Sequence, residues 1–340
     1  MKRILGAWLV VAVAVPACSA EVDVGGPRSN ASAGSRAIGG ETDGDGVVQT
    51  PDSAAGGAET TGASGGAKAS SGGTGSTSSN EAGADGSPGP AQGGSSSGDS
   101  GFKILVLSKA LMFKHASIRD CEQLLTTLGQ TPDGKMPPGT DPGSQFTIDI
   151  AKDDLSDFTD ERLRHYAMIF SCHATGPVFS AGGANGQIGM AAIQKFIEGG
   201  GAWAGVHAAT DFEKNGGFPW FTNVLVGAYL DTHDAAGTLA SVQIEAGFTD
   251  HPVVRGLPAS ATVADEWFNM NRDIRAQPGF QVLASLATDQ RPVVWVKELG
   301  EDAKGRMFYT TRGHDPTVYS EPYFRELVLN GILWAAHRLH

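Results

Sequence analysis

Four histidines of this chain each follow a short apolar run, and they are the residues best placed to do chemistry. They are His115, His173, His207 and His314. If the runs form parallel strands, their carboxyl ends meet at one edge of a sheet, where open α/β folds bind ligands. We therefore expect these imidazoles to share a pocket, although His173 fits a structural role equally well. A neutral imidazole can accept a proton or bind a metal ion.

His207 lies at the apex of a segment made of a strand, a tight turn and small residues, Gly205-Val206-His207-Ala208-Ala209. The pattern is that of a nucleophile elbow, but the apex residue is histidine instead of serine or cysteine. Covalent acyl chemistry is therefore not expected. Cys172 is expected to be a small buried side chain, because no base is assured beside it.

Histidines from several strands, joined by the carboxylate of Glu266, fit a catalytic metal site with three protein ligands and an open position, as in zinc enzymes. The metal ligands would then be His115, His207 and His314. The chain has no short-spaced motif such as His-Glu-x-x-His, so metal-free proton transfer by His207 and Glu266 stays open. Glu266 also fits a plain solvated acid at a strand end. The remaining histidines His165, His251, His337 and His340 are expected to be structural.

The elements that must position these side chains alternate between strand and helix. Strands are predicted at 103–108, 146–150, 167–172, 202–206 and 306–311, and helices at 117–128, 160–166, 188–198 and from Pro322 onward. This alternation predicts a three-layer α/β fold, with a mostly parallel sheet and helices on both faces. Between Thr238 and Lys297 the period shifts toward two, which predicts added antiparallel or edge strands. Residues 183–186 are predicted to be a loop.

The first hundred residues differ sharply in composition from the rest. Residues 1–17 have a basic start and an apolar run, and a small residue precedes Cys18, which is typical of a secretory signal followed by a lipidated cysteine. Residues 18–101 are rich in Gly, Ser, Ala and Thr, which predicts a disordered tether, and residues 102–340 form the globular domain. We expect an exported protein, periplasmic or at the cell surface, anchored to a bacterial membrane through Cys18.

Charge and cysteine content narrow the function classes further. The net charge is −12 and no part of the chain has a basic stripe, so nucleic acid is not an expected partner. Cys121 and Cys172 are the only cysteines after Cys18, and an exported location permits one bond between them. The domain has no Gly-x-Gly-x-x-Gly after its first strand, which disfavours a nicotinamide enzyme. The sequence does not indicate an oligomeric state.

Four segments together resemble the ThuA-like, or trehalose utilisation, family: 112–117, 199–211, 265–268 and 308–314. The similarity spans nearly all of residues 102–340. It implies a flavodoxin-like fold of the class I glutamine amidotransferase type with the catalytic cysteine absent, so that glutamine amidotransferase activity is not expected. His207 stands at the corresponding apex, and His314 stands where that superfamily carries its histidine. The family often has an aromatic hydroxyl where this chain has Phe268, which removes one hydrogen bond.

The resemblance implies a carbohydrate as the small-molecule partner, and further side chains can be considered on that basis. Trp220 and Trp267 would stack on a pyranose ring, unless they belong to the core as most large aromatics do. Asp211 would orient a sugar hydroxyl or cap a helix. His173 would contact substrate, and His233 ends a segment that loosely resembles a family loop.

The function expected from these features is the processing of a glycoside or an oxidised keto sugar, through His/Glu acid–base or metal-assisted chemistry. Catalysis would fall to His115, His207, Glu266 and His314. The reaction class stays open between a sugar hydrolase, an isomerase and a lyase. The alternative is a non-catalytic carbohydrate-binding module at the cell surface, which would need the aromatic residues but not His207.

Overall fold

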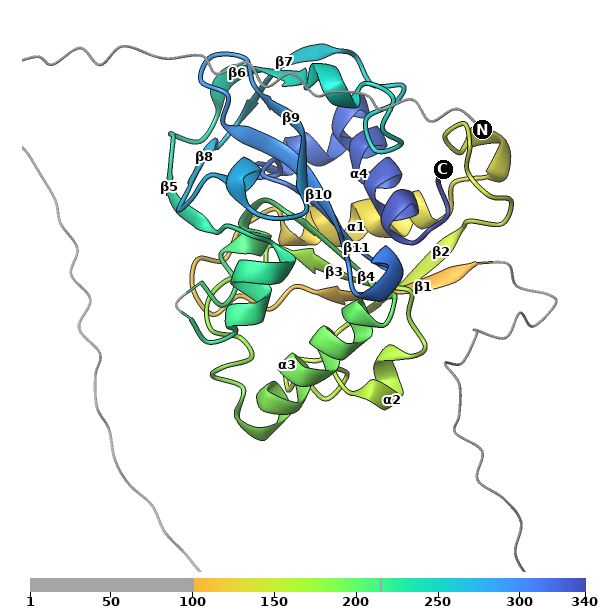
Figure 1. The fold of residues 1–340 in the computed structure, drawn as a ribbon, viewed down its shortest axis with the longest axis vertical. Helices are drawn as coiled ribbons and strands as arrows, with labels where there is room; N and C mark the ends of the chain where they lie inside the picture. Colours follow the sequence, from red (N-terminus) through yellow and green to blue (C-terminus); the bar gives the residue numbers. More distant parts are fainter. Residues whose placement is uncertain (1–100, 215) are drawn as a thin grey trace, which may run out of the picture. The chain divides into compact units, whose positions relative to one another are not determined.

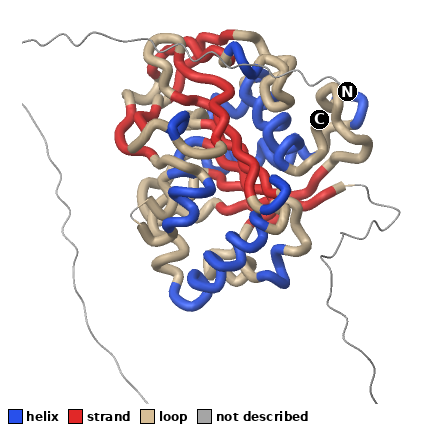
Figure 2. The backbone as a smooth tube through the Cα atoms, viewed as in Figure 1, coloured by secondary structure: helices blue, strands red, loops and turns tan. Residues whose placement is uncertain are grey.

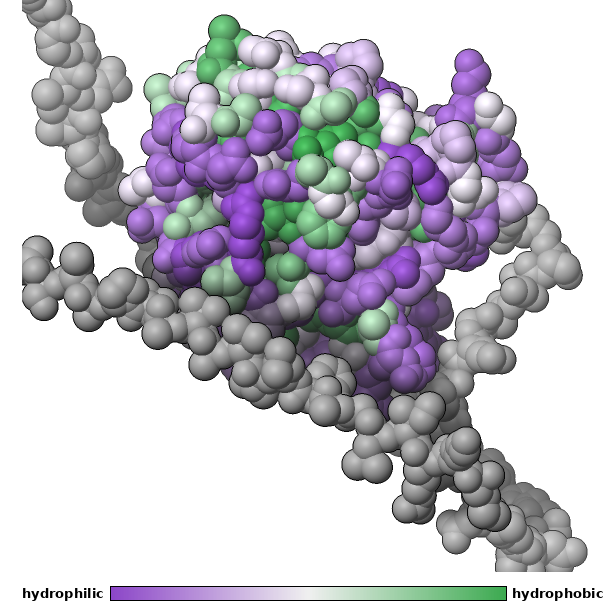
Figure 3. Space-filling view, turned by 45° about the horizontal axis from the view of Figure 1, so that its top comes forward, coloured by the Kyte–Doolittle hydropathy of each residue, from purple (hydrophilic) through white to green (hydrophobic). Residues whose placement is uncertain are grey.

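The computed structural model describes residues 101–214 and 216–340. The predicted signal sequence at 1–17, Cys18 and all but the last residue of the predicted tether lie outside these ranges. Among the described residues, no helix has both the length and the apolar character that a membrane crossing requires. Figure 3 shows a largely hydrophilic surface on the face in view, where the hydrophobic side chains form small patches separated by polar ones.

A nine-stranded sheet in the order β2-β1-β3-β4-β11-β10-β9-β6-β7 runs through the domain (Figure 1). The strands of its parallel half are β2 (Phe146–Ile150), β1 (Phe102–Leu107), β3 (Met168–Cys172), β4 (Ala202–Val206) and β11 (Gly305–Thr310). The strands of its antiparallel half are β10 (Pro292–Leu299), β9 (Phe280–Leu286), β6 (Thr238–Ile244) and β7 (Ser260–Asp265). A separate pair, β5 (Leu230–His233) and β8 (Phe268–Met270), forms a small antiparallel sheet.

Helices cover both faces of the parallel half, as Figure 2 shows by the strands running between groups of helices. One core cluster joins the sheet to α1 (Ile118–Gly129) and α4 (Pro322–Ala335). The other joins it to α2 (Asp160–Leu163) and α3 (Gly183–Glu198). The alternation along β1 explains this arrangement, because Ile104 and Val106 enter the first cluster while Leu105 and Leu107 enter the second. The predicted α/β class with added antiparallel strands is confirmed.

Most predicted elements appear within a residue or two of their expected bounds, and two predictions are wrong. The helix expected at 160–166 ends at Leu163. Residues 183–186, predicted to be a loop, form the first turn of α3. Glycine is needed there because a Cβ at Gly186 would lie 1.9 Å from the carbonyl oxygen of Phe179, so the helix start packs directly on that backbone.

A disulfide joins Cys121 in α1 to Cys172 at the end of β3, with the two Cα atoms 5.9 Å apart. The side chain of Cys172 is buried, as predicted, and its sulfur is in addition bonded to that of Cys121. The bond fixes the start of α1 against the carboxyl end of β3. His173 directly follows that strand end.

Candidate functional site

The register of three neighbouring strands brings histidines that are distant in sequence to one place. Cys172 of β3 is opposite Val206 of β4, and Val206 is opposite Thr310 of β11. The three strands are parallel, so they end level with one another, and the segments that follow them leave the same edge of the sheet. His173 and His207 follow directly, and His314 follows after a short turn. This is the edge that the sequence predicted.

His207 occupies a strained turn at the end of β4. Its φ is +50°, a left-handed conformation uncommon for a residue with a side chain, and a short 3-10 helix begins at the same residue and runs to Thr210. The elbow geometry predicted for residues 205–209 is therefore confirmed. The conformation directs the imidazole into the buried space at the sheet edge, where its side chain is fully buried.

Three hydrogen-bonding atoms form a nearly equilateral triangle at this edge. Nε2 of His207 lies 3.2 Å from Nδ1 of His314 and 3.4 Å from Oε2 of Glu266. Nδ1 of His314 lies 3.3 Å from the same carboxylate oxygen. Glu266 follows β7 and reaches the histidines from the antiparallel half of the sheet.

His115 completes the group. One ligand atom from each of His115, His207, Glu266 and His314 can be chosen so that all lie within 4.8 Å of one another. The ring of His115 is 4.8 Å from that of His207 and 5.3 Å from that of His314, measured between centroids. The four residues predicted to be catalytic thus converge in space. We refer to them as the His/Glu cluster.

The electrostatics of the cluster favour a neutral His115 beside an ionised Glu266. Burial, followed by the nearby His207 and His314, lowers the pKa of His115 from 6.5 to about 3. Burial of Glu266 by itself raises the pKa of its carboxyl, but the hydrogen bond and charge of His207, with His314 and His233, outweigh it and lower the pKa below its ordinary value. A carboxylate and uncharged imidazoles are the protonation states that bind a metal ion.

His173 lies behind the cluster instead of in its centre. Its ring is 4.9 Å from that of His115, and Nε2 is 2.5 Å from the hydroxyl of Tyr319. Burial, then the charges of His207 and His115, lower its pKa well below the ordinary value. His173 is fully buried and its Nε2 contacts Tyr319, so in this structure it packs behind the cluster and is not exposed to solvent.

His233 of β5 reaches Glu266 from the solvent side. Its Nδ1 is 3.1 Å from Oε1 of Glu266, and its side chain is 48% exposed. The weaker resemblance of its loop to the family therefore still located a residue at the site. Phe268 packs its ring 4.6 Å from that of His207, measured between centroids, so an apolar ring lines this side of the cluster.

The other predicted substrate-binding residues do not join the cluster. Asp211 pairs with Lys214, with its Oδ1 2.5 Å from the ammonium, and it is not among the clustered ligand atoms. Trp267 is 1% exposed and donates its indole N–H to the carbonyl oxygen of Thr238, which makes it a core residue. Trp220 donates to Glu198, which precedes β4 and therefore lies at the opposite edge of the sheet.

Asp265, which the sequence analysis missed, positions the loop that carries His314. Its carboxylate accepts hydrogen bonds from the main-chain N–H groups of Glu266, Gly313 and His314 at 2.9, 3.0 and 3.1 Å. It also pairs with Arg312 at 3.3 Å, and neither side chain is exposed. The sequence signal that could have revealed this role is the adjacency of Asp265 to Glu266. Glu266 reaches the His/Glu cluster, and Asp265 fixes the loop that carries His314.

Ser117 ties the start of α1 to the same loop. Its hydroxyl donates to the carbonyl oxygen of His314 at 2.8 Å, and it makes no side-chain cap on its own helix. Gly313, with φ of +125°, allows the turn, because a Cβ there would lie 2.7 Å from the hydroxyl of Tyr319. The loop that carries His314 is therefore held by contacts from Asp265, Ser117 and Tyr319.

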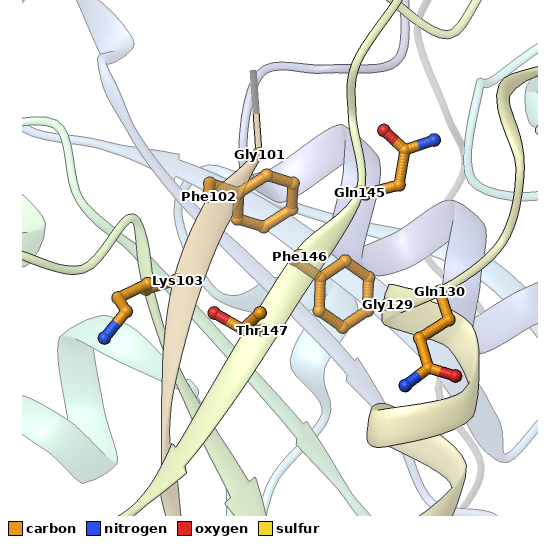
Figure 4. A pocket seen from close by; sticks show the side chains of 8 residues that line it. All are labelled: Gly101, Phe102, Lys103, Gly129, Gln130, Gln145, Phe146 and Thr147. Atoms are coloured by element: carbon orange, nitrogen blue, oxygen red, sulfur yellow. The ribbon is translucent and has the colours of Figure 1, made fainter. Parts of the chain in front are cut away.

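Two pockets help to locate substrate. One of about 390 Å³ lies at the amino ends of β1 and β2, where Figure 4 shows the rings of Phe102 and Phe146 side by side and Lys103 pointing away from them. It is at the edge opposite the histidines, and among the described residues that line it Lys103 alone is ionisable. A second pocket, of about 600 Å³, is lined by His115. The second pocket is therefore the one that adjoins the chemistry.

Comparison with known proteins agrees with this arrangement. The family model described as ThuA, trehalose utilisation, matches residues 103–335. A solved ThuA-like protein from Bacteroides uniformis ATCC 8492 has a TM-score of 0.54 and 24% identity, covering 69% of this chain and 91% of that one. Another, from Parabacteroides merdae ATCC 43184, has a TM-score of 0.50 and 17% identity, covering 70% and 91%. No curated protein matches.

Proposed function

The chain belongs to the ThuA, or trehalose utilisation, family, and on that premise we propose that it processes a carbohydrate with a divalent metal held by the His/Glu cluster. His207, His314 and Glu266 would be the three principal ligands, and His115 would be either the fourth ligand or a hydrogen-bond acceptor beside the ion. The set is the two-histidine, one-carboxylate type that zinc hydrolases use.

The single observation that carries the proposal is the size of the triangle. Zinc bonds to nitrogen and oxygen ligands are about 2.0–2.2 Å long, and tetrahedral geometry then places neighbouring ligand atoms roughly 3.3–3.6 Å apart. The three edges here are 3.2, 3.3 and 3.4 Å. At least two of the three atoms bear lone pairs directed at one another, which is unfavourable unless a cation or a shared proton lies between them.

The surrounding contacts are those expected around a metal ligand. Nδ1 of His207 donates to the carbonyl oxygen of Thr311 at 2.9 Å, which leaves Nε2 unprotonated in the neutral ring. Asp265 fixes the main chain at His314, and Phe268 shields one side of His207 from water. A bound divalent ion would lower the pKa of a water molecule or polarise a sugar carbonyl.

The protein's own groups then supply proton transfer and binding. His115 stays neutral because burial lowers its pKa to about 3, so its imidazole is available as a metal ligand or as a hydrogen-bond acceptor for a sugar hydroxyl, although it is a weak base. His233 contacts the outer oxygen of Glu266 from an exposed position, where it can exchange a proton with solvent. These roles suit either hydrolysis of a glycoside or enolisation next to a keto group.

An exposed aromatic ring supports the carbohydrate assignment. Phe113 is 65% exposed, and its ring lies edge-on to His115 with centroids 4.7 Å apart. Its carbonyl oxygen accepts a hydrogen bond from Thr175 at 3.0 Å, which anchors the backbone of the loop. An apolar ring held at the mouth of a polar site suits the C–H face of a pyranose. Phe113 takes the place of Trp220 and Trp267 as the proposed stacking residue.

The test is turnover of a panel of glycosides and their keto derivatives, before and after treatment with a chelator. We expect turnover to vanish on chelation, to return with added divalent metal, and to be lost in Glu266→Gln but not in Glu298→Gln, an exposed acid in β10. Turnover that survives chelation would favour metal-free proton transfer by His207 and Glu266. Binding of a sugar without conversion in every metal-loaded sample would favour a carbohydrate-binding module.

We also propose that the protein is exported and anchored to a bacterial membrane through Cys18. The Cys121–Cys172 disulfide supports an oxidising compartment outside the cytoplasm. The test is phase partitioning of the protein from membranes, in which Cys18→Ser should move it from the detergent phase to the aqueous phase. Partitioning that is unchanged in Cys18→Ser would exclude lipidation at this residue.

A further inference from the structure

The pocket beside His115 has features that the proposed metal chemistry does not explain. It has a volume of about 600 Å³ and lies between the carboxyl end of β1, the start of α1 and the residues that follow β2. The cations that line it are Lys109, Lys114 and Arg119. This grouping is unusual in a chain whose net charge is −12.

The three cations have no carboxylate partner among residues 101–214 and 216–340. The ammonium of Lys109 donates to the main-chain oxygen of Asp153 at 2.5 Å, and no salt bridge joins Lys114 or Arg119 to an acid within those ranges. Elsewhere on this surface other cations do meet an acid, as Lys103 does with Asp149 and Arg162 with Asp157. Unpaired cations around a cavity indicate a site for an anion.

The pocket also receives the start of a long helix. Ala116, Ile118 and Arg119 line it, and α1 extends for 12 residues from Ile118. The hydroxyl of Ser117 donates to the carbonyl oxygens of Gly313 and His314. The first N–H groups of α1 therefore have no side-chain cap from Ser117. An uncapped helix start carries a partial positive charge that favours negative groups.

Buried polar atoms without partners line the same pocket. His115 is 7% exposed, and its Nδ1 has no hydrogen-bond partner within the described part of the chain. The buried hydroxyl of Ser108 also has none there. Buried polar atoms are normally satisfied, so such atoms in a pocket wall indicate a ligand that completes them. His115 also belongs to the His/Glu cluster, so a molecule in the pocket would reach the cluster.

We propose that this pocket binds an oxyanion group of the substrate, a carboxylate or a phosphate, so that the substrate is an acidic sugar derivative. The identification of the bound anion as part of a substrate rests on the proposed function. The anion site itself does not depend on the metal. Lys114 and Arg119 hold the anionic group in the pocket that His115 lines, and Lys109 adds charge from the segment after β1.

Two acids, Glu122 and Asp153, also line the pocket. A carboxylate accepts hydrogen bonds from sugar hydroxyls but repels an anion. We therefore assign the anionic group to Lys114 and Arg119, and the neutral hydroxyls to Glu122 and Asp153.

The test is calorimetric titration of the full chain with glucose, glucuronate and glucose 6-phosphate. We expect at least one of the two acidic sugars to bind about tenfold or more tightly than glucose, since hydrogen bonds to charged groups are the stronger class. Preference for glucuronate would identify a carboxylate as the ligand, and preference for glucose 6-phosphate a phosphate. The preference should vanish in the double variant Lys114→Gln/Arg119→Gln and persist in Lys304→Gln, an exposed lysine outside the pocket. Equal binding of all three sugars would overturn the proposal.

A chelator separates this proposal from the proposed function. If the preference for an acidic sugar is lost on chelation or in His314→Ala but persists in the double variant, the anion binds at the metal and the pocket proposal is wrong. If the preference depends on Lys114 and Arg119 while the protein binds no metal and converts no sugar, the anion pocket stands and the proposed function fails.

Discussion

The imidazole of His207 is locked by the backbone of the neighbouring strand end, because its Nδ1 lies 2.9 Å from the carbonyl oxygen of Thr311. A carbonyl oxygen only accepts, so Nδ1 must carry the proton. In the neutral ring the other nitrogen, Nε2, then offers its lone pair to the space shared with His314 and Glu266. The tautomer that a metal ligand needs is thus set by main-chain geometry, which no substitution at Thr311 removes.

Asp265→Ala should destabilise the fold strongly. The change leaves Arg312 buried with only Glu321 as partner and removes the acceptor for two N–H groups of the His314 loop. Breaking a buried ion pair costs about 3–5 kcal/mol. Denaturant unfolding should show a loss of this size, whereas Asp289→Ala, which breaks the exposed pair with Arg291, should cost about 1 kcal/mol or less. Similar losses in the two variants would contradict the assigned role.

Reduction of the Cys121–Cys172 disulfide should also lower stability. The bond closes a loop with a sequence separation of 51, which in the chain-entropy model corresponds to roughly 4 kcal/mol of stabilisation. The double variant Cys121→Ala/Cys172→Ala should therefore unfold at a lower denaturant concentration than the oxidised protein. Its midpoint should not respond to a reducing agent. An unchanged midpoint relative to oxidised wild type would mean that the bond adds nothing.

Stability should fall on acidification partly because of His251. Burial, then the charge of Arg306, lowers its pKa from 6.5 to about 4. Between those values the unfolded chain binds a proton that the folded protein does not, so the free energy of unfolding decreases as pH falls from about 6.5 to 4, by at most about 1.4 kcal/mol per pH unit for one group.

His251→Asn should remove this part of the slope, because asparagine keeps an acceptor for the N–H of Val253 but does not titrate. Unfolding midpoints measured at intervals from pH 7 to 4 provide the check. His165→Asn, at an exposed position, is the matched control and should leave the slope as it is. A wild-type slope in His251→Asn would show that the acid sensitivity comes from elsewhere.

Phe113→Ala should weaken sugar binding without loss of structure. Its ring is 65% exposed, so truncation removes almost no core packing. Aromatic stacking contributes about 0.5–1.5 kcal/mol, which predicts a roughly 2- to 10-fold rise in the dissociation constant for methyl glucoside. Phe113→Trp should retain affinity. Leu239→Ala, at a side chain 71% exposed on β6, should have no effect. Equal affinities of wild type and Phe113→Ala would remove Phe113 from the site.

The sequence was informative where periodicity and strand ends determine position. The convergence of His115, His207 and His314 followed from one rule, that parallel strands end at the same edge, and the fold obeys it. The order of the strands in the sheet could not be predicted from the sequence, because β11 pairs with β4 although the two lie more than a hundred residues apart in the chain. No local pattern encodes that pairing.

The side chains that the sequence misplaced were those whose role depends on burial. Trp267 and Trp220 were considered for stacking on residue type alone, but Trp267 is enclosed by the core and Trp220 lies at the other edge of the sheet. Phe113 was overlooked as a stacking residue because exposure of an aromatic ring is not visible in a sequence. Asp265 was missed for the complementary reason, since its partners are main-chain amides of a distant loop.

Metal content of the purified full-length protein tests the central claim most directly, namely that the His/Glu cluster is a metal site. Mass spectrometry of protein reconstituted with a divalent metal and desalted should find one ion per chain in wild type and in Glu298→Gln. It should find well below that in Glu266→Gln and His314→Ala, since even changes around the ligands cost about 10- to 100-fold in affinity. A wild-type protein without stoichiometric metal, or equal metal in all four proteins, would contradict the account.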